Sequence, residues 1–361
     1  MTRPRDVRLL CVAPDTVVPP VSGSAARTYG LAAAVRPHLG SVELRCFSSA
    51  PAPVATTGGL EVVHIPRPST GVARARYLTT ALLGPLLGYR FPTSLAGDRL
   101  VQLASPLLYE GARRAGLGRF VLDAHNVYQD MTGFPQASLR DRVFYRLTRR
   151  RQARMEAACW AAAAHVIFCS TVDRDRAERL APGIAARSTI VPNCVDTREF
   201  APRPAAAFAR GGPVIFVGTT RYPPNFFAVQ EICHDLAPAL PHLEFLIVGE
   251  APYRPARVPG NVRFLGRVET TAAPLAAARV ALARVRRGGG TRLGLDIEDG
   301  AHLRLAESPA ALVAAIRDLH ADARASAALG ASARALAESR YDWRAWVPGL
   351  LQVYVAQAPT C

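Results

Sequence analysis

Two short stretches of sequence decide the fold: VPNCVD at residues 191–196 and VIFVG at residues 214–218. The first ends an apolar strand in Pro192 and Asn193. The second begins a new buried strand after a connector rich in proline and alanine, residues 203–212. A strand that stops in Pro-Asn and restarts beyond such a connector is typical of a boundary between two domains. We therefore expect Pro192 and Asn193 to form a hinge between two α/β domains.

The composition fits a two-domain globular protein. The chain has 361 residues, of which 50% are hydrophobic and 20% are charged, so it can bury a sizeable core in each domain. Its best apolar run, residues 157–169, is too short to span a membrane and is interrupted by His165. The apolar stretch at residues 7–13 has the length of a strand, and we interpret it as the first core strand rather than as a signal peptide.

The cysteines and the net charge bear on the redox compartment of the protein and on its partners. The seven cysteines are scattered and form no C-x-x-C pair, which predicts a reducing cytosol and neither a disulfide framework nor a zinc site. The net charge is +16, and every basic residue is arginine. This charge is typical of proteins that meet anionic lipids, glycans or nucleic acid, and equally of codon bias in a GC-rich genome.

Short strands alternate with helices along the whole chain. We expect helices from about 25 to 37, from about 139 to 163 (rich in arginine) and after a cap near 170–171, and mostly helical structure across residues 66–118. Further helices are expected at 225–236, 272–278, about 309–322, about 323–339 and a last one that ends near 357. The expected strands are 7–13, 42–47, 60–65, 120–123, 166–169, 189–191, 214–217, 243–249 and 261–265. This alternation predicts parallel, doubly wound sheets.

Two motifs of the first half follow strands. The turn at residues 19–27 contains Gly23 and Arg27 and precedes a helix, so its backbone N–H groups could face an anion, or it could simply join a strand to a helix. His125, in Asp-Ala-His-Asn at 123–126, lies past the carboxyl end of a strand, where ligands collect in parallel sheets. It could hydrogen-bond a sugar hydroxyl, or be a loop histidine satisfied by backbone.

The second half offers candidates for a phosphate-binding site. Arg221 follows the strand that ends at Gly218 and precedes the helix that includes Asn225, where its guanidinium can meet a diphosphate with bidentate geometry. Gly249 ends the next strand and allows a ligand to approach the backbone closely. The loop at 286–292 is the strongest candidate, because it combines three glycines with a hydroxyl and flanking arginines; its alternative is an ordinary surface turn.

Residues 173–175, Asp-Arg-Asp, match the D-x-D signature with which some sugar transferases bind a metal. They lie at the start of an expected helix, where acidic side chains favour the helix dipole. We therefore interpret them as helix-capping residues and expect no metal site.

These motifs, in this order, resemble family 4 of the retaining glycosyltransferases. The resemblance covers nearly the whole chain and includes the Gly23/Arg27 turn, DAHN at 123–126, VPNCVD at 191–196, FVG at 216–218 with YPPN at 222–225, IVG at 247–249, GGGTRL at 288–293 and YDW at 341–343.

The resemblance implies the GT-B architecture, an α/β fold of two facing Rossmann-like, doubly wound domains. The first would span residues 1–192 and be joined by the last helix, about 342–357; the second, at 193–341, would hold the donor nucleotide. The resemblance also implies metal-independent transfer from a UDP- or GDP-sugar, without a cofactor. His125 would be the catalytic contact to the transferred sugar. The donor-binding residues would be Gly23, Arg27, Gly218, Arg221, Asn225, Gly249, Gly289, Gly290, Thr291 and Arg292.

One departure from the family pattern affects the donor site. In relatives, the glycine-rich loop continues into a helix and a strand, whereas here Leu293 is followed directly by Gly294. The absent unit carries the second glutamate of the family's E-x7-E motif, which holds the donor ribose, and the first glutamate aligns with Gly289. We therefore expect an incomplete second domain and an impaired donor pocket.

Three functional interpretations follow. The first is a transferase at the inner face of the cytoplasmic membrane that extends a glycan or lipid-linked acceptor of the cell envelope. The second is a non-catalytic descendant that binds a nucleotide sugar or regulates a partner. The third, a nucleic-acid-binding protein, is supported by charge alone, because the sequence has no basic patch interleaved with aromatic residues and no recognition-helix pattern.

Overall fold

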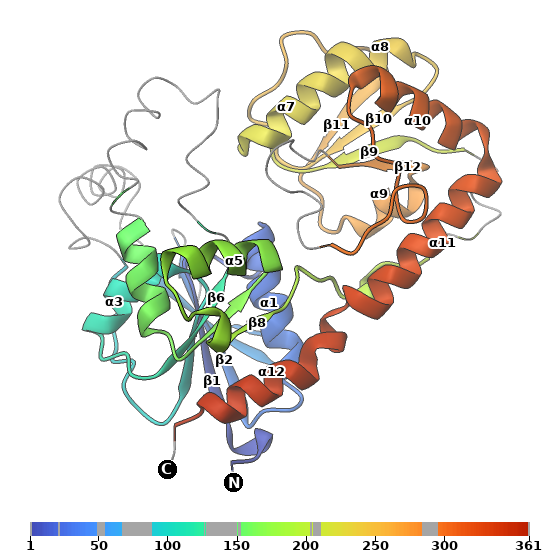
Figure 1. Ribbon diagram of the computed structural model, residues 1–361. Coiled ribbons are helices and arrows are strands. Elements are labelled where there is room, and N and C mark those ends of the chain that lie inside the picture. The colour runs from blue at the N-terminus through green and yellow to red at the C-terminus, as the bar shows by residue number, and fades with distance from the viewer. Residues whose placement is uncertain are drawn as a thin grey trace. The chain divides into compact units, whose positions relative to one another are not determined.

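The computed structural model of the protein describes residues 2–20, 22–48, 55–66, 89–125, 127, 150, 153–202, 204, 211–283 and 295–359. The chain divides into two compact units (Figure 1). Unit 1 comprises Met1–Val195 and Trp343–Cys361, and unit 2 comprises Asp196–Asp342. Unit 2 is thus inserted into the sequence of unit 1, and the chain passes between the units twice.

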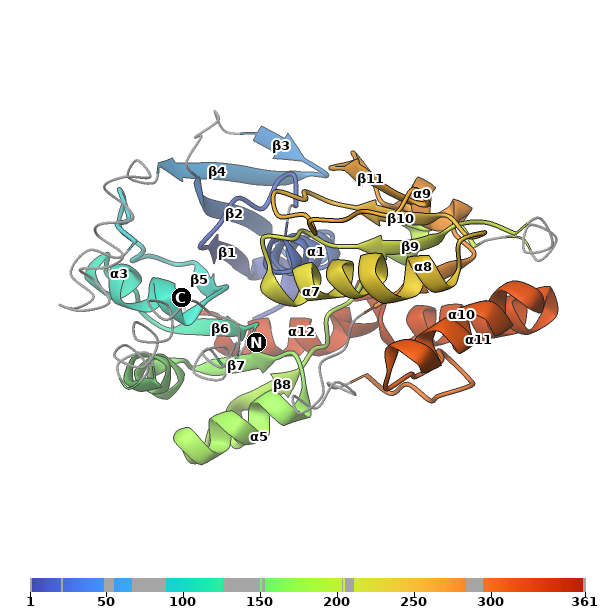
Figure 2. The same cartoon turned by 90° about the horizontal axis from the view of Figure 1, so that it is seen from above.

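Unit 1 is built on an eight-stranded sheet in the order β3-β4-β2-β1-β5-β6-β7-β8, seen from above in Figure 2. All pairings are parallel except β3 with β4. Without β3, the strands follow the order of a dinucleotide-binding domain with one strand added. The strands are β1 Arg8–Ala13, β2 Ser41–Ser48, β3 Ala55–Thr57, β4 Leu60–Pro66, β5 Leu100–Leu103, β6 Phe120–Ala124, β7 His165–Phe168 and β8 Ser188–Ile190.

Helices cover both faces of this sheet, and the alternation of side chains along β1 shows why. Leu9 and Cys11 join the hydrophobic cluster that includes α1 and α12, whereas Leu10 and Val12 join the cluster that includes α3, α5 and the helical residues 153–162. A parallel strand buried on both faces is a continuous apolar run, as β1 is. The described helices of unit 1 are, besides the helical residues 153–162, α1 Gly23–Val35, α3 Tyr109–Arg114, α5 Thr171–Leu180 and α12 Trp343–Gln357.

The last helix, α12, completes unit 1 by packing on α1 (Figure 1). Gly30 in α1 makes this contact possible, because a Cβ at that position would lie 2.3 Å from Nε1 of Trp343. Further along α12, the buried Tyr354 donates its hydroxyl to Oε1 of Gln102 in β5, at 2.7 Å. The C-terminal segment therefore contributes to the core of the first half of the sequence.

Strand β5 corrects the expectation that residues 66–118 are mostly helical. Leu100–Leu103 forms a fully buried strand between β1 and β6, near the centre of the sheet. Its sequence, LVQL, is only four residues long and has no alternation that would distinguish a strand from a buried turn of helix. Helix does follow it, in the 3₁₀ turn Pro106–Leu108 and in α3. Residues 67–88 of the same segment lie outside the described residues.

Unit 2 is built on a four-stranded parallel sheet in the order β11-β10-β9-β12. Numbered within the unit, this is the first part, 3-2-1-4, of the 3-2-1-4-5-6 order of a dinucleotide-binding domain. The strands are β9 Val214–Val217, β10 Phe245–Val248, β11 Val262–Gly266 and β12 Val280–Leu282. Strand β12 is absent from the expected strands, because its three residues are too few to form a recognisable pattern.

Both faces of this sheet are also covered. One hydrophobic cluster joins the sheet to α7, the π-helical turn, α8 and α10, and a smaller one joins it to α9. The helix expected at 225–236 starts earlier, at Pro223, and continues through the π-helical turn Ile232–Leu236. The helices of unit 2 are α7 Pro223–Glu231, α8 Ala237–Ala239, α9 Ala272–Ala277, α10 Pro309–Ala321 and α11 Ala323–Arg340.

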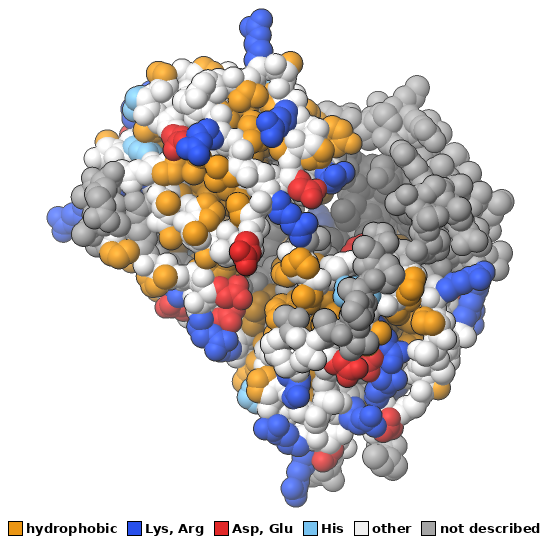
Figure 3. Space-filling model, turned by 180° about the vertical axis from the view of Figure 1, so that it is seen from behind, with side chains coloured by type: hydrophobic (Ala, Val, Ile, Leu, Met, Phe, Trp, Pro, Cys, Tyr) orange, Lys and Arg blue, Asp and Glu red, His pale blue; other side chains and the backbone are white. Residues whose placement is uncertain are grey.

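Two surface properties bear on the sequence predictions. Among the described residues, no helix is both long enough and apolar enough to cross a membrane. The face in Figure 3 shows the basic side chains in several separate places, interspersed with acidic ones, rather than gathered in a single basic patch.

Candidate functional site

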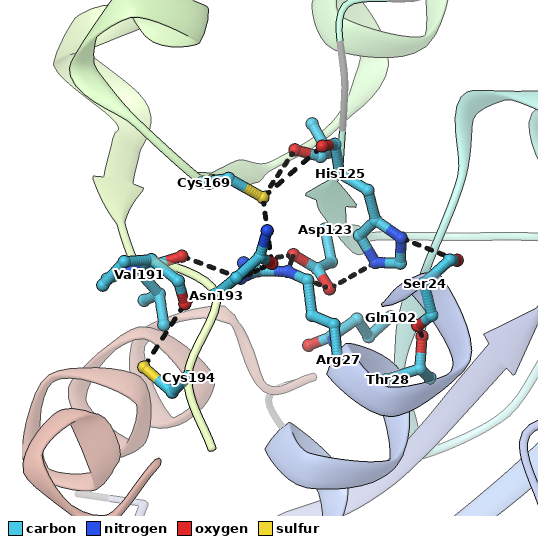
Figure 4. A network of polar contacts seen from close by, with 12 residues as sticks. Ser24, Arg27, Thr28, Gln102, Asp123, His125, Cys169, Val191, Asn193 and Cys194 are labelled. Carbon is cyan, nitrogen blue, oxygen red and sulfur yellow. Dashed lines mark hydrogen bonds and ion pairs between the residues drawn. The ribbon is translucent and has the colours of Figure 1, made fainter. Parts of the chain in front are cut away.

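The centre of the candidate site in unit 1 is a buried ion pair between Arg27 in α1 and Asp123 near the end of β6 (Figure 4). Nη2 and Nε of Arg27 donate to Oδ1 of Asp123 at 2.8 and 3.0 Å, and the two side chains are 1% and 0% exposed. Nη1 of Arg27 donates to the carbonyl oxygens of Val191 and Pro192, both at 2.9 Å, and to Oδ1 of Asn193 at 3.2 Å. One guanidinium therefore ties α1 and β6 to the segment after β8.

His125 continues this network from Asp123 to Ser24 (Figure 4). Its Nε2 lies 2.8 Å from Oδ2 of Asp123, and its Nδ1 lies 2.9 Å from Oγ of Ser24 at the start of α1. Burial raises the pKa of Asp123, but Arg27 and His125 outweigh burial and lower this pKa to about 2. Asp123 is therefore a carboxylate at neutral pH, and His125 is anchored on it with a fixed ring orientation.

Cys169, directly after β7, contacts both the His125 backbone and the Asn193 side chain. Its Sγ lies 3.5 Å from the carbonyl oxygen of His125 and 3.7 Å from Oδ1 of Asn193. Burial raises the pKa of this thiol to about 12, so Cys169 is a protonated donor to these oxygens and not a nucleophile. No signal in the sequence points to this role, because a single cysteine after a strand is usually a core residue.

The structure places Arg27 in the core of unit 1. The glycine turn that precedes Arg27 placed it among the residues expected to bind the donor. However, its side chain is almost fully buried, and Nε, Nη1 and Nη2 all donate within the protein. A phosphate could reach it only if the ion pair with Asp123 broke. By contrast, Gly23 is exposed, with no atom within 4 Å of the position of a Cβ.

Pro192 and Asn193, expected as the hinge, lie inside unit 1 and are held there by Arg27. The division between the units comes after Val195, whose carbonyl oxygen accepts a hydrogen bond from the backbone N–H of Trp343. On the unit 2 side, Thr197 donates its hydroxyl to Oδ2 of Asp342 at 2.6 Å. Residues on either side of both chain crossings are therefore fixed within their own unit.

The carboxyl edge of the unit 2 sheet is lined by glycines at three strand ends. Gly249 has a φ of +126°, and a Cβ there would lie 2.5 Å from the carbonyl oxygen of Gly218. A Cβ on Gly218 would in turn lie 2.6 Å from Nδ2 of Asn225, which donates to the carbonyl oxygen of Thr219 at 3.0 Å. Gly266, which ends β11, was not singled out from the sequence. Asn225 therefore stabilises the loop after β9, and the absence of a Cβ on Gly218 and Gly249 lets the segments at this edge pack closely.

Arg221 lies at the same edge, just before α7. Its Nε donates to Oε2 of Glu250 at 3.0 Å, and the two side chains are 64% and 46% exposed. Nη1 of Arg267 lies 4.0 Å from the other carboxylate oxygen. Two arginines therefore flank one exposed acid where strands β9, β10 and β11 end. Glu250 and Arg267 were missed, although each directly follows a strand-ending glycine, Gly249 and Gly266.

Four predicted donor-binding residues lie outside the described residues: Gly289, Gly290, Thr291 and Arg292. The same holds for Asn126 and for the junction of Leu293 and Gly294. Asp173, from the metal-like signature, lies in the first turn of α5, where its N–H donates to the capping hydroxyl of Ser170. Within the described ranges, no group of His, Cys, Asp or Glu side chains is arranged to hold a metal ion.

Together, the two doubly wound units define the GT-B fold of glycosyltransferases. No protein-family model matches the sequence, and no curated protein matches it. Among solved structures, HepE of Anabaena in complex with UDP and glucose is similar, with a TM-score of 0.65, 14% identity, and coverage of 95% of this chain and 98% of that one.

Two further structures have the same architecture. Sucrose-phosphate synthase from Thermosynechococcus elongatus has a TM-score of 0.65 and 16% identity, over 96% of this chain and 98% of that one. WaaG, a glycosyltransferase involved in lipopolysaccharide biosynthesis, has a TM-score of 0.61 and 14% identity, over 98% of this chain and 100% of that one. At these identities the likeness establishes the fold.

Proposed function

We propose that this protein is a retaining glycosyltransferase of family 4 that moves a hexosyl group from a nucleoside-diphosphate sugar to a glycan or lipid-linked acceptor. The observation that carries the proposal is His125, held by the buried pair of Arg27 and Asp123 at the carboxyl end of β6. Ligands of parallel sheets bind at this end. UDP is the first choice of nucleotide, because the HepE structure, which shares the fold, contains UDP.

In this proposal unit 2 binds the diphosphate. Negative charge grows on the leaving diphosphate as the bond to the sugar breaks, and a guanidinium neutralises it with directed hydrogen bonds. Arg221 is exposed at the carboxyl edge, next to the first residues of α7, and Gly249 lets the backbone of Gly218 approach closely at the same edge. The loop at 288–292 would add backbone N–H groups and Arg292. No step in this scheme needs a metal ion.

We propose further that the donor pocket is impaired by the absent helix and strand after Leu293. What supports this is the order of the unit 2 sheet, in which the described strands stop after the fourth of the six positions of a dinucleotide-binding domain. Loss of the ribose contact to a glutamate would remove one hydrogen bond to a charged group, about 1.5–3 kcal/mol. Donor binding would then be weaker by roughly ten- to a hundredfold.

We place the protein in the cytoplasm, at the inner face of the membrane, and expect no nucleic acid among its partners. Support for a reducing compartment comes from the cysteines, since the six in the described residues are free thiols. Support for anionic headgroups as a peripheral partner is the net charge of +16.

The test is a panel of UDP-, GDP- and ADP-sugars. Binding should appear as an increase in the unfolding temperature, because a ligand of the native state stabilises it. Release of nucleotide in the presence of acceptor would identify a transferase, and binding without release would identify the non-catalytic alternative. If turnover reaches the rates of intact family members, the pocket is not impaired. If no nucleotide sugar binds while DNA or RNA binds tightly, the proposal is wrong.

A further inference from the structure

Ser24 is the outermost member of a chain of four polar side chains. Arg27 and Asp123 are buried, His125 is 8% exposed, and Ser24 is partly exposed at the second position of α1. Its Oγ lies 2.9 Å from Nδ1 of His125, the one contact that this hydroxyl makes with a side chain among the described residues (Figure 4). Neither ring nitrogen of His125 is therefore left free to meet a ligand, and the hydroxyl of Ser24 lies between this ring and the surface.

For a neutral His125 ring, the donors and acceptors of the chain allow one consistent direction for all of its hydrogen bonds. A guanidinium only donates and a carboxylate only accepts, so Asp123 accepts from Arg27 and also from Nε2 of His125. A neutral ring with its proton on Nε2 has an acceptor at Nδ1. Ser24 must then give its single hydroxyl proton to His125. Its Oγ can then still accept a hydrogen bond from a ligand, but it has no proton left to donate.

We propose that Oγ of Ser24 accepts a hydrogen bond from a hydroxyl group of the sugar substrate. This assignment rests on the proposed glycosyltransferase function. It changes the ligand expected at the turn of residues 22–24, whose sequence indicated an anion. A phosphate only accepts hydrogen bonds, so it would face an oxygen whose proton is already used, whereas a sugar hydroxyl can donate to that oxygen.

The neighbouring backbone does not separate the two kinds of ligand. Ser22 satisfies two of the first N–H groups of α1, because its hydroxyl accepts from the N–H of Ala25 and its carbonyl oxygen from that of Ala26. Among the described residues, the N–H groups of Gly23 and Ser24 have no partner, and such donors can serve a phosphate or a sugar oxygen equally. The acceptor on Oγ of Ser24 is therefore the contact that distinguishes a sugar hydroxyl from a phosphate.

The first test compares the affinities of two probes, UDP and UDP-glucose, by calorimetry. Ser24→Ala should weaken binding of UDP-glucose about fivefold, the size expected for one neutral hydrogen bond, and leave UDP unchanged. Ser24→Thr, which keeps the hydroxyl, should restore the affinity. Ser22→Ala is the matched control for disturbance of the helix start and should not separate the two probes. Equal loss for UDP and UDP-glucose, or no loss for either, would overturn the proposal.

The second test needs no ligand and therefore separates failure of this proposal from failure of the proposed function. In protein labelled with ¹⁵N-histidine, the resonances of His125 are identified by their absence in His125→Gln. We expect the proton on Nε2 and a free electron pair on Nδ1, and Ser24→Ala should shift the Nδ1 resonance most. A proton on Nδ1 in the unaltered protein would reverse the direction of the chain and refute the assignment. If neither these probes nor any sugar nucleotide of the panel binds but Nδ1 is unprotonated, the proposed function and the sugar contact fall together, while the direction of the chain stands.

Discussion

Removal of either partner of the buried pair between Arg27 and Asp123 should strongly destabilise unit 1. Arg27→Met leaves a carboxylate without a countercharge in a site that is 0% exposed, and Asp123→Asn leaves a buried guanidinium in the same position. Breaking a buried pair by removing one partner costs about 3–5 kcal/mol. Arg27→Met should lie at the upper end of this range, because the carbonyl oxygens of Val191 and Pro192 also lose their donor.

The double variant, with both Arg27→Met and Asp123→Asn, tests whether the two buried side chains depend on each other. With both changes the site holds no net charge, and the amide oxygen that Asp123→Asn introduces can still accept from Nε2 of His125. The cost should therefore be well below the sum of the two single changes, with a coupling energy of about 2–3 kcal/mol. The lost donor to the two carbonyl oxygens remains in both Arg27→Met proteins and cancels in the cycle.

Tryptophan fluorescence during urea unfolding measures these effects in the right unit. All three tryptophans, Trp160, Trp343 and Trp346, belong to unit 1, so the signal reports this unit alone. A matched control is the pair Arg8–Asp98, which has the same residue types and a distance of 2.7 Å, but side chains that are 55% and 65% exposed. Changes there should stay within about 0.5 kcal/mol.

Two outcomes would refute this reasoning. If each single variant at the buried site lost less than about 1 kcal/mol, water or other polar groups would have to solvate the remaining charge. If the two single effects added without coupling, the two side chains would not depend on one another. In either case His125 would lack the fixed carboxylate on which the proposed site is built.

Three further predictions concern single positions. Arg221→Ala should weaken binding of UDP about tenfold in calorimetry without changing stability. The control is Arg263→Ala, because Arg263 is equally exposed in an ion pair at the amino edge of the same sheet and should affect neither binding nor stability. Equal effects of both changes would contradict a diphosphate site at Arg221. Gly249→Ala should lower the free energy of unfolding of unit 2 by about 2 kcal/mol or more, because φ at this residue is +126° and the added Cβ would meet the carbonyl oxygen of Gly218. Limited proteolysis should therefore cleave unit 2 faster. An unchanged rate of cleavage would show that the loop adapts. The pKa of Asp123 in the folded protein, about 2, lies below its ordinary value of 3.8. The carboxylate therefore stabilises unit 1 by about 2 kcal/mol above pH 3.8, and this contribution is lost as the pH falls through 2. If acid unfolding, followed by fluorescence, were the same in Asp123→Asn, this prediction would be wrong.

The fold could be predicted in large part because most strands are continuous apolar runs next to recognisable turns. Strands such as β1, β6, β9 and β10 are of this kind, and the fold class that they indicated, with two doubly wound units, is confirmed. The three strands that were missed, Ala55–Thr57, Leu100–Leu103 and Val280–Leu282, are short. What identifies them is pairing with β4, β1 and β9, which is a tertiary property and leaves no periodic pattern.

The candidate site was harder to predict, because position in a motif does not say where a side chain points. His125 lies at a strand end, as expected, but both of its partners, Asp123 and Ser24, were left out of the predicted site. Arg27 was assigned to the donor since it follows a glycine turn. In the structure it lies one helical turn into α1, on the face that packs against the sheet, and only the position of Asp123 explains why it is buried.

The insertion of unit 2 into unit 1 sets an order of events during synthesis. Unit 1 lacks α12 until the ribosome has made residues 196–342, and its core stays open at Gly30 and Gln102, where Trp343 and Tyr354 later pack. At roughly 5–20 residues per second, this delay amounts to about seven to thirty seconds. The nascent first half is therefore exposed to chaperones for this time, and the whole of unit 2 is synthesised before the core of unit 1 can close.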